Sequence, residues 1–386
     1  MRPDVSVLIP TYNEAENINL IVGRVSNILK KENYEILIID DNSPDGTWRI
    51  AEELGENDER IRIIRRMGEK GLSSAVMTGM ASARGKYFVV MDADLQHDEN
   101  ILPQMIGDLS SGFDLAVGTR YASGGSVGKW SALRSLMSRF ATWFARRFLP
   151  IGVSDPMSGF FGLKKEVFDR VENRMNPRGF KILLEILGRS KVALKVAEIP
   201  YIFRNRARGD SKLDNSVVRN FLVAILDIRF GKWVSPTFLL YCIVGFLGVF
   251  VNIGGFLFLE AAGFGEVHTG FRILPKFSLS VLFGIELSVI SNFVLNNYFT
   301  FYERRYFRWD ALRGFLIFSL VSVLGIFVQL SVFHFLYYRL LPEFGSTPGW
   351  EARLVCDLLA IALAMFTNYL LNSNVTWMES KKSLSR

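Results

Sequence analysis

Four long apolar segments in the second part of the chain constrain its fold more than any other sequence feature. The first of them, residues 234–259, contains no charged residue. Three further segments carry few charges or none, at residues 277–302, 314–338 and 354–377. Each is longer than the roughly 20 apolar residues with which a helix crosses a bilayer. We therefore predict an integral membrane protein with four transmembrane helices, at about 235–259, 277–301, 312–340 and 354–377.

The loop charges predict how these helices cross the membrane. Basic residues gather between the second and third segments and in the C-terminal tail, at Arg304, Arg305, Arg308, Arg313, Lys381, Lys382 and Arg386. The positive-inside rule then places both termini and the N-terminal domain in the cytoplasm. Because the basic residues follow the membrane boundary, the net charge of +7 favours anionic lipid over nucleic acid as a partner.

The membrane segments also contain a repeat. Residues 238–252 align without gaps on 315–329, and residues 291–303 align on 367–379. We interpret the repeat as a helical hairpin used twice in the same topology, with its recurring Asn and Thr residues favouring helix packing over headgroup binding. Glu286 is not repeated, and its role stays open between a functional acid and a hydrogen bond to a neighbouring helix. Whether the helices anchor the protein, flip lipid or form a homo-oligomer also stays open.

Residues before about 234 read as a soluble α/β domain. Short β-branched runs, which predict strands, alternate with patterns that predict helices. The strands fall at residues 5–9, 35–39, 61–64, 87–91 and 114–117, and the helices at 14–31, 47–54 and 71–84. This alternation predicts a parallel sheet covered by helices. In such a sheet a ligand binds beyond the carboxyl ends of the strands.

Polar clusters follow four of these strands and are expected to meet at one edge of the sheet. They are PTYNE (residues 10–14), DDNSPDGT (40–47), RRMGEKG (65–71) and DADLQ (92–96). Glu14, Asp40 and Asp41 can accept hydrogen bonds from ribose hydroxyls or a base edge, and Lys70 can meet a phosphate. The glycine-rich dinucleotide fingerprint is missing after the first strand, and so is a phosphate loop, which excludes a hydride-transfer site.

Asp92, Asp94 and Gln96 come at the end of the fourth strand, and alternate side chains of an extended chain share a face. Oxygen ligands in this arrangement suit Mg²⁺ or Mn²⁺ better than zinc, and such ions keep positions open for substrate phosphates. A cation there neutralises the charge of a departing diphosphate. The sequence therefore predicts a nucleoside-diphosphate site in which these three residues bind the metal and serve catalysis.

These motifs carry a resemblance to a known family. The segments VSVLIPTYNEAENI, ILIIDDNSPDGT, EKGLSSAVMTGMASARGKYFVVMDADLQHDEN and LAVGTRY resemble the inverting family 2 glycosyltransferases with a GT-A fold, over about residues 4–121. More narrowly, the chain resembles the dolichol-phosphate (polyprenyl-phosphate) mannose synthases. Its membrane part is similar to the GtrA-like four-helix domain that is fused to some of them. The resemblance implies transfer of mannose from GDP-mannose to dolichyl phosphate, giving a β-linked product.

The resemblance also implies residue roles and boundaries. Pro10, Tyr12, Glu14 and Asp41 are expected to hold the nucleoside, and Asp92, Asp94 and Gln96 the metal and the diphosphate. The expected domains are a catalytic domain at 1–215, with a nucleotide half at 4–121 and an acceptor region at 122–215, an interfacial helix at 216–233, and a transmembrane domain at 234–386.

Basic and apolar residues together mark the region expected to bind a lipid acceptor. Residues 129–150 and 217–233 space their apolar side chains as a helix does, with arginines among them. This pattern predicts helices that lie in the membrane interface, with ordinary packing on the soluble domain as the alternative. Arg120 is expected to bind the acceptor phosphate together with Arg134 and Ser138.

Residues 203–212 (FRNRARGDSK) resemble the loop that closes over the donor and the lipid phosphate in the synthases. We expect a mobile lid in which Arg206 and Lys212 bring positive charge to two phosphates, the alternative being a solvated basic loop. Asp155 lies in a segment where relatives present an acid to the acceptor. It either orients the acceptor or caps the turn before Pro156.

A phosphate acceptor simplifies the expected mechanism. A sugar hydroxyl needs a general base, whereas a phosphate monoester, with a second pKa of about 6, is already ionised at neutral pH. Its oxygen is expected to attack the anomeric carbon opposite the diphosphate and to invert its configuration. Two alternatives stay open, a polyprenyl-phosphate glucosyltransferase that uses UDP-glucose and a non-enzymatic flippase for lipid-linked sugars with a nucleotide-sensing domain. The missing Gln-x-x-Arg-Trp signature argues against a processive polysaccharide synthase.

Overall fold

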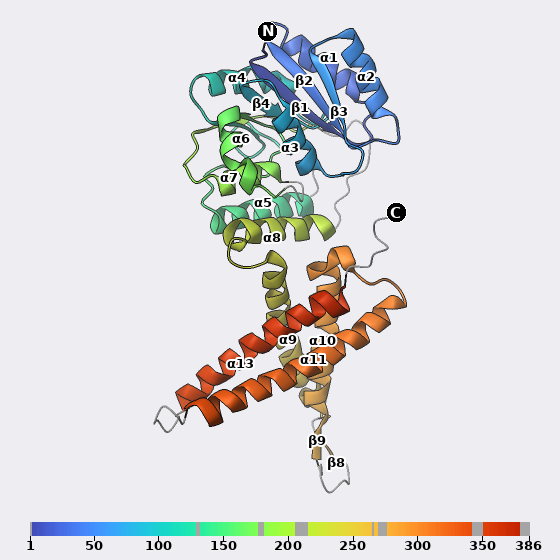
Figure 1. The fold of residues 1–386 in the computed structure, drawn as a ribbon, viewed down its shortest axis with the longest axis vertical. Helices are drawn as coiled ribbons and strands as arrows, with labels where there is room; N and C mark the ends of the chain where they lie inside the picture. Colours follow the sequence, from blue (N-terminus) through green and yellow to red (C-terminus); the bar gives the residue numbers. More distant parts are fainter. Residues whose placement is uncertain are drawn as a thin grey trace. The chain divides into compact units, whose positions relative to one another are not determined.

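The computed structural model describes residues 2–128, 132–176, 181–204, 215–264, 266–268, 276–341 and 350–378. The chain divides into two compact units, Met1–Lys232 and Trp233–Arg386 (Figure 1). The first contains the α/β sheet and the second contains the apolar helices.

The first unit is built on a seven-stranded sheet with the strand order β3-β2-β1-β4-β6-β5-β7. Its strands are β1 Val5–Thr11, β2 Tyr34–Asp40, β3 Ile61–Arg65, β4 Tyr87–Val90, β5 Leu115–Thr119, β6 Phe161–Lys164 and β7 Val196–Pro200. Every residue of β1 and β2 is buried, as expected for parallel strands covered on both faces. The prediction of an all-parallel sheet is wrong in one respect, because β6 runs antiparallel to both β4 and β5.

Helices cover both faces of this sheet (Figure 1). One face is covered by α1 Ile18–Ile28, α2 Thr47–Asn57 and α4 Leu102–Ser110. The other is covered by α3 Leu72–Ser82, α5 Ala132–Phe148, α6 Lys165–Val171, α7 Ile182–Arg189 and α8 Asn215–Phe230. Successive residues of β1 alternate between the two cores, with Val7 and Ile9 in one and Leu8 in the other.

The carboxyl ends of β1, β2 and β4 lie at one edge of the sheet because these strands are parallel and in register. Thr11 pairs with Asp40, and Leu8 pairs with Val90. The turn after each strand contains a non-glycine residue in the left-handed region, Asn13 at φ 61°, Asn42 at φ 54° and Leu95 at φ 63°. Such conformations cost energy and persist where the surrounding contacts enforce them, which makes this edge a candidate functional site.

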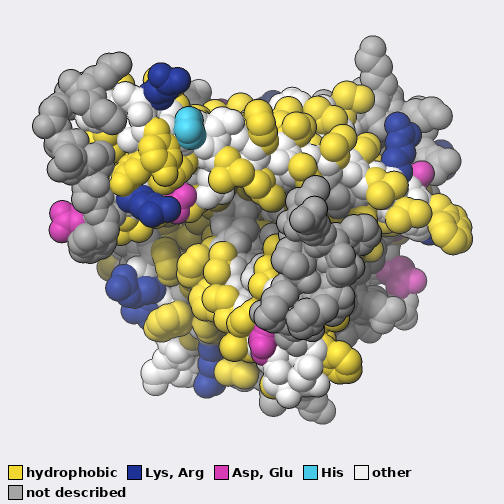
Figure 2. Space-filling model, turned by 90° about the horizontal axis from the view of Figure 1, so that it is seen from below, with side chains coloured by type: hydrophobic (Ala, Val, Ile, Leu, Met, Phe, Trp, Pro, Cys, Tyr) yellow, Lys and Arg dark blue, Asp and Glu magenta, His cyan; other side chains and the backbone are white. Residues whose placement is uncertain are grey.

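Among its described residues, the second unit contains four helices long and apolar enough to span a membrane, as predicted. The candidate spans are Pro236–Ala261, Leu279–Thr300, Asp310–Leu340 and Glu351–Thr376. They comprise α9 Pro236–Ala261, α10 Leu279–Leu295, α11 Asp310–His334 and α13 Trp350–Leu371, and a short β8–β9 ribbon (Glu266–His268 and Lys276–Ser278) lies between α9 and α10. Their many exposed apolar side chains suit a lipid environment, and hydrophobic side chains cover much of the face seen in Figure 2.

The helices of the second unit pack as two hairpins, α9 with α10 and α11 with α13. Gly248 of α9 faces Asn292 of α10, and Gly325 of α11 faces Asn368 of α13. Each hairpin also ends in a π-helical turn, at Asn296–Thr300 and at Asn372–Thr376. Corresponding residues of the aligned segments thus make the same kind of contact in both hairpins.

We predict that Gly284→Ala lowers the free energy of unfolding by about 1–3 kcal/mol, because overpacking forces neighbouring atoms apart. A Cβ at position 284 would lie 2.6 Å from the backbone oxygen of Asn252, which cannot move away as a side chain can. Thermal unfolding of the purified protein in detergent measures the effect. Gly254→Ala is the matched control, because a Cβ there meets nothing within 4 Å. Equal midpoints for the two variants would contradict this close helix crossing.

Candidate active site

A cavity of about 380 Å³ lies at the carboxyl edge of the sheet. Seven of the residues predicted to bind nucleotide, diphosphate or metal line it, namely Pro10, Tyr12, Glu14, Asp41, Lys70, Asp92 and Asp94. Thr11, Gly71, Leu72, Ala75 and Ala93 complete its wall. The structure therefore brings together the turns that follow β1, β2 and β4 and the start of α3.

Asp41 joins the turn after β2 to the segment between β3 and α3. Its Oδ1 accepts a hydrogen bond from Nε of Arg66 at 2.7 Å, and its Oδ2 accepts one from the backbone N–H of Gly71 at 2.7 Å. Arg66 is nearly buried and also donates to Ser74 Oγ at 3.0 Å. Sequence reasoning missed this role of Arg66, although it lies in the quoted RRMGEKG segment, because nothing in the sequence distinguishes it from Arg65.

Asp40 does not line the cavity, although the sequence predicted it to bind the nucleotide. Its carboxylate is fully buried and accepts hydrogen bonds from Thr11 Oγ1 at 2.9 Å and Ser43 Oγ at 2.6 Å. It also accepts one from the backbone N–H of Ser43 at 2.8 Å. Asp40 therefore holds the turn beneath the cavity and is not among the residues that line it.

Lys70 and Tyr12 form the exposed rim of the cavity. The ammonium of Lys70 donates to the hydroxyl of Tyr12 at 3.3 Å and lies 4.9 Å from the centre of its ring. Glu14 accepts a hydrogen bond from Nδ2 of Asn17 at 2.7 Å. A flexible cation beside an exposed aromatic ring suits the phosphate and base ends of a nucleotide.

The turn that contains Asp92, Asp94 and Gln96 is not the extended strand that the sequence predicted. Strand β4 ends at Val90, and the chain then turns through Leu95 at φ 63°. The backbone N–H of Gln96 donates to Oδ1 of Asp94 at 3.1 Å, which closes the turn. A turn, and not strand alternation, therefore brings these side chains together.

His97 anchors this turn from below. Its Nδ1 accepts a hydrogen bond from the backbone N–H of Asp92 at 3.2 Å, and its ring stacks on Phe160 with centroids 5.0 Å apart. Tyr201 and Phe203 lie edge-on or tilted to the same ring, each with centroids 5.9 Å away. Burial lowers the pKa of His97 to about 4, so the imidazole is neutral at neutral pH.

The predicted metal ligands suit a hard cation. Asp94 and Gln96 are nearly buried, Asp92 is partly exposed, and all three offer oxygen. Nε2 of Gln96 donates to the backbone oxygen of Arg204 at 3.0 Å, which leaves Oε1 as the atom that can coordinate. Within the described residues no group of three or more His, Cys, Asp or Glu could hold a metal ion, so a site here depends on the glutamine. This donor set fits Mg²⁺ or Mn²⁺.

Arg120 and Asp155 form a buried, bidentate ion pair. Nε of Arg120 donates to Oδ2 at 2.7 Å and Nη2 donates to Oδ1 at 2.9 Å, while the Asp155 side chain is fully buried. Burial alone would lower the pKa of Arg120, but the hydrogen bonds that Arg120 donates to the Asp155 carboxylate raise it overall. Asp155 therefore fixes the direction of the Arg120 guanidinium and does not project toward solvent as a free acid.

Lys181 lies near the site, and sequence reasoning missed it. It lies directly before α7, and its charged neighbours are Arg120, Asp155 and Asp92. Burial, followed by the repulsion from Arg120, lowers the pKa of Lys181 to about 8. No motif marks this lysine, because only the fold brings residue 181 to the end of β5.

The structure describes some of the other residues that were predicted to bind the acceptor. Ser138 Oγ accepts a hydrogen bond from the hydroxyl of Tyr121 at 2.7 Å, which fixes α5 to the turn after β5. The side chain of Arg134 and both Arg206 and Lys212 lie outside the described residues. Arg204, at the start of the predicted lid, pairs with Asp98 and Glu99 at 2.7 and 2.8 Å.

Comparisons with known proteins identify the families that both parts of the chain match. Residues 6–172 match the family model described as glycosyl transferase family 2, and residues 240–377 match the model described as the GtrA/DPMS transmembrane domain. A dolichol-phosphate mannosyltransferase from Pyrococcus furiosus is 41% identical over 377 residues, which are 97% of this chain and 99% of that protein. The chain belongs to the dolichol-phosphate mannosyltransferase family.

Two further relatives each match more than half of this dolichol-phosphate mannosyltransferase family member. A dolichol-phosphate mannosyltransferase from Mycosarcoma maydis is 38% identical over 59% of this chain and 81% of its own length. A polyprenol monophosphomannose synthase from Mycolicibacterium smegmatis is 35% identical over 58% of this chain and 86% of its own length. The protein is thus a membrane-bound glycosyltransferase, and its mixed sheet with covering helices is a GT-A-like fold.

Proposed function

We propose that this glycosyltransferase moves mannose from GDP-mannose to a dolichyl or polyprenyl phosphate and inverts the anomeric configuration. One observation supports a phosphate acceptor independently of the family match. Both carboxylate oxygens of Asp155, the acid expected to face the acceptor, accept hydrogen bonds from Arg120. That arrangement supplies a fixed cation and no general base. It suits an acceptor that arrives already ionised, as a phosphate does and a sugar hydroxyl does not.

The residues in and around the cavity have separate roles in this reaction. The turn at Asp41 and the rim at Tyr12 and Lys70 hold the nucleotide. Asp92, Asp94 and Gln96 hold a divalent cation, which offsets the negative charge that develops on the leaving diphosphate. Arg120, directed by Asp155, binds the acceptor phosphate so that its oxygen lies in line with the anomeric carbon.

The membrane orientation is part of the proposal. The basic connection between α10 and α11 and the basic tail support a cytoplasmic position for the catalytic unit and for both termini. Nucleotide sugars made in the cytoplasm would then reach the cavity directly. We propose that the catalytic domain ends at residue 215, that the interfacial helix spans 216–233 and that the transmembrane domain spans 234–386.

A donor competition tests this function. We expect purified protein, given dolichyl phosphate, Mn²⁺ and a mixture of GDP-mannose and UDP-glucose, to produce a lipid that carries mannose and to release GDP. Mass spectrometry of the lipid extract, with isotope-labelled glucose to separate the two hexoses, reads the result. Omission of the divalent cation should stop the reaction. A glucosylated lipid without its mannosylated counterpart would instead support the glucosyltransferase reading.

A further inference from the structure

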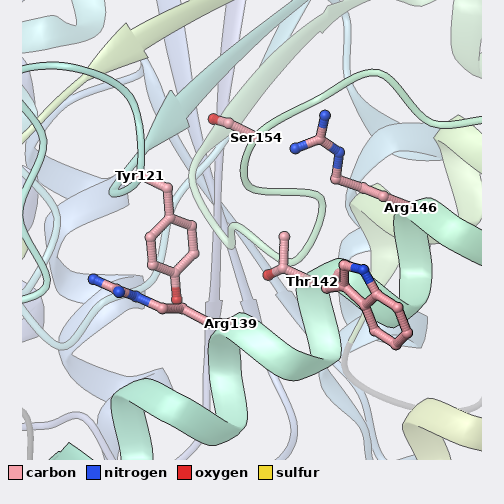
Figure 3. Close-up of a pocket in the computed structure, with 6 residues that line it drawn as sticks. Tyr121, Arg139, Thr142, Arg146 and Ser154 are labelled. Carbon is pink, nitrogen blue, oxygen red and sulfur yellow. The ribbon is translucent and has the colours of Figure 1, made fainter.

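A second cavity of about 380 Å³ lies between α5 and the turns after β5 and before β6 (Figure 3). It is lined by Tyr121, Arg139, Thr142, Trp143, Arg146 and Ser154, and we refer to it as the α5 pocket. None of these residues lines the nucleotide cavity. The cation expected to bind the acceptor phosphate, Arg120, is not among them.

The α5 pocket is cationic. Arg139 and Arg146 are seven positions apart on one helix, so they lie along the same side, with Thr142 between them. In Figure 3 the two guanidinium groups lie on opposite sides of the space that Tyr121, Thr142 and Ser154 surround. Neither arginine makes a hydrogen bond or an ion pair with any residue that the structure describes, and α5 contains no acidic residue. Glu198, which does not line the pocket, accepts a hydrogen bond from the backbone N–H of Ser154.

Thr142 gives independent evidence for a ligand. Thr142 is 8% exposed, and its Oγ1 is buried without a hydrogen-bond partner among the described residues. The other hydroxyls at the wall have partners, since Tyr121 donates to Ser138 and Ser154 bonds to Thr119 at 2.7 Å. A buried hydroxyl without a partner is costly, so such groups in folded proteins are normally satisfied. An anion bound between the two guanidinium groups would accept a hydrogen bond from the Thr142 hydroxyl through one of its oxygens.

The surroundings of the pocket indicate which anion this is. Leu136, Phe140 and Trp143 follow a helical stripe beside the arginines, and all three are exposed, by 65%, 61% and 59%. A stripe of exposed apolar side chains next to a stripe of cations is typical of a helix that lies in a membrane interface. The same chain contains four candidate membrane spans. Apolar side chains contact acyl chains in such an interface, and arginines contact lipid phosphates.

We propose that the α5 pocket binds the phosphate headgroup of an anionic bilayer phospholipid, which is not the acceptor of the reaction. The two guanidinium groups bind the phosphate oxygens, and the hydroxyl of Thr142 donates to one of them. The bound lipid seats α5 at the bilayer surface. Through the hydrogen bond between Tyr121 and Ser138, it steadies the turn that carries Arg120.

The test uses the full-length protein, purified and reconstituted in phosphatidylcholine with or without phosphatidylglycerol. Native mass spectrometry after detergent exchange identifies retained lipid by mass. We expect wild-type protein to retain phosphatidylglycerol and the Arg139→Gln/Arg146→Gln variant to retain at least about ten-fold less, a change of about 1.4 kcal/mol. The matched control is Arg147→Gln/Arg170→Gln, which removes the same charge from exposed positions outside the pocket and should retain the lipid as wild type does.

Thr142→Val separates a lipid site from a merely structural pocket. Valine fills the same space without the hydroxyl. Phosphatidylglycerol should raise the unfolding midpoint of wild-type protein by more than it raises that of Thr142→Val, while in phosphatidylcholine alone the variant should be at least as stable as wild type. An equal rise in the two proteins would overturn the proposal.

Three other outcomes would also overturn it. If the control variant lost as much lipid as the pocket variant, general surface charge would explain the loss. Displacement of phosphatidylglycerol by dolichyl phosphate would make the pocket part of the acceptor site. Retention of inorganic phosphate as strong as that of the lipid would make it a site for free anions.

Discussion

Asp94→Asn is expected to lower the rate of mannose transfer by about 10³-fold or more, the effect of removing one group that stabilises developing charge at a water-excluded site. The substitution removes one of two carboxylates from a donor set that contains no third acid. It also preserves the fold, because Oδ1 of asparagine can still accept the backbone N–H of Gln96, the 3.1 Å bond that closes the turn. Steady-state rates at saturating donor and acceptor measure the loss.

Two controls make this result specific. Asp169→Asn also replaces a carboxylate with an amide, but at an exposed position on α6 where the aspartate pairs with Lys165. It should leave the rate unchanged. Binding of Mn²⁺, followed by its electron paramagnetic resonance signal, should weaken in Asp94→Asn and not in Asp169→Asn. Normal turnover by Asp94→Asn would contradict the proposed metal site.

Asp155→Asn is expected to lower the free energy of unfolding by about 3–5 kcal/mol, the usual cost of leaving one charge of a buried pair without its partner. For a unit of this size the unfolding midpoint should fall by about 6 to 20 °C. Transfer measured well below that midpoint should also fall, by about 10²-fold, because a misdirected Arg120 no longer places the acceptor phosphate in line. Differential scanning fluorimetry and rate measurements on the same preparation read both effects.

A double variant distinguishes stability from catalysis at this pair. Arg120→Met/Asp155→Leu replaces both charges with apolar groups, which is often neutral for stability. We expect the unfolding midpoint to recover most of the loss while transfer stays low. Recovery of transfer together with stability would show that Arg120 does not bind the acceptor.

The sequence predicted the two-part architecture well because its strongest signals are local. Apolar length alone locates the four spans, and the parallel strands β1, β2 and β3 are short runs rich in Val and Ile. It did not predict β6 and β7. Strand β6 is only four residues long, and it owes its antiparallel position between β4 and β5 to tertiary pairing that no local pattern reveals.

The site was predictable where residues follow a strand and was not where the fold supplies them from elsewhere. Tyr12, Asp41 and Asp92 reach the cavity because each follows a strand whose end the sequence marks. The roles of Asp40 and Asp155 depend on hydrogen-bond partners, and the sequence does not show whether a carboxylate faces a cavity or a neighbouring side chain. Lys181 comes to the site from a different segment, so only the arrangement of α7 against the sheet identifies it.

The anomeric configuration of the product tests the central claim most directly. The claim is that the oxygen of an ionised lipid phosphate attacks the sugar in line, opposite a diphosphate held at the turn of Asp92, Asp94 and Gln96. The protein would be given GDP-α-mannose labelled with ¹³C at the anomeric carbon, and the one-bond carbon–hydrogen coupling of the purified lipid product would be measured by NMR. We predict a β-linked mannosyl phosphate. A product that keeps the α configuration would contradict it.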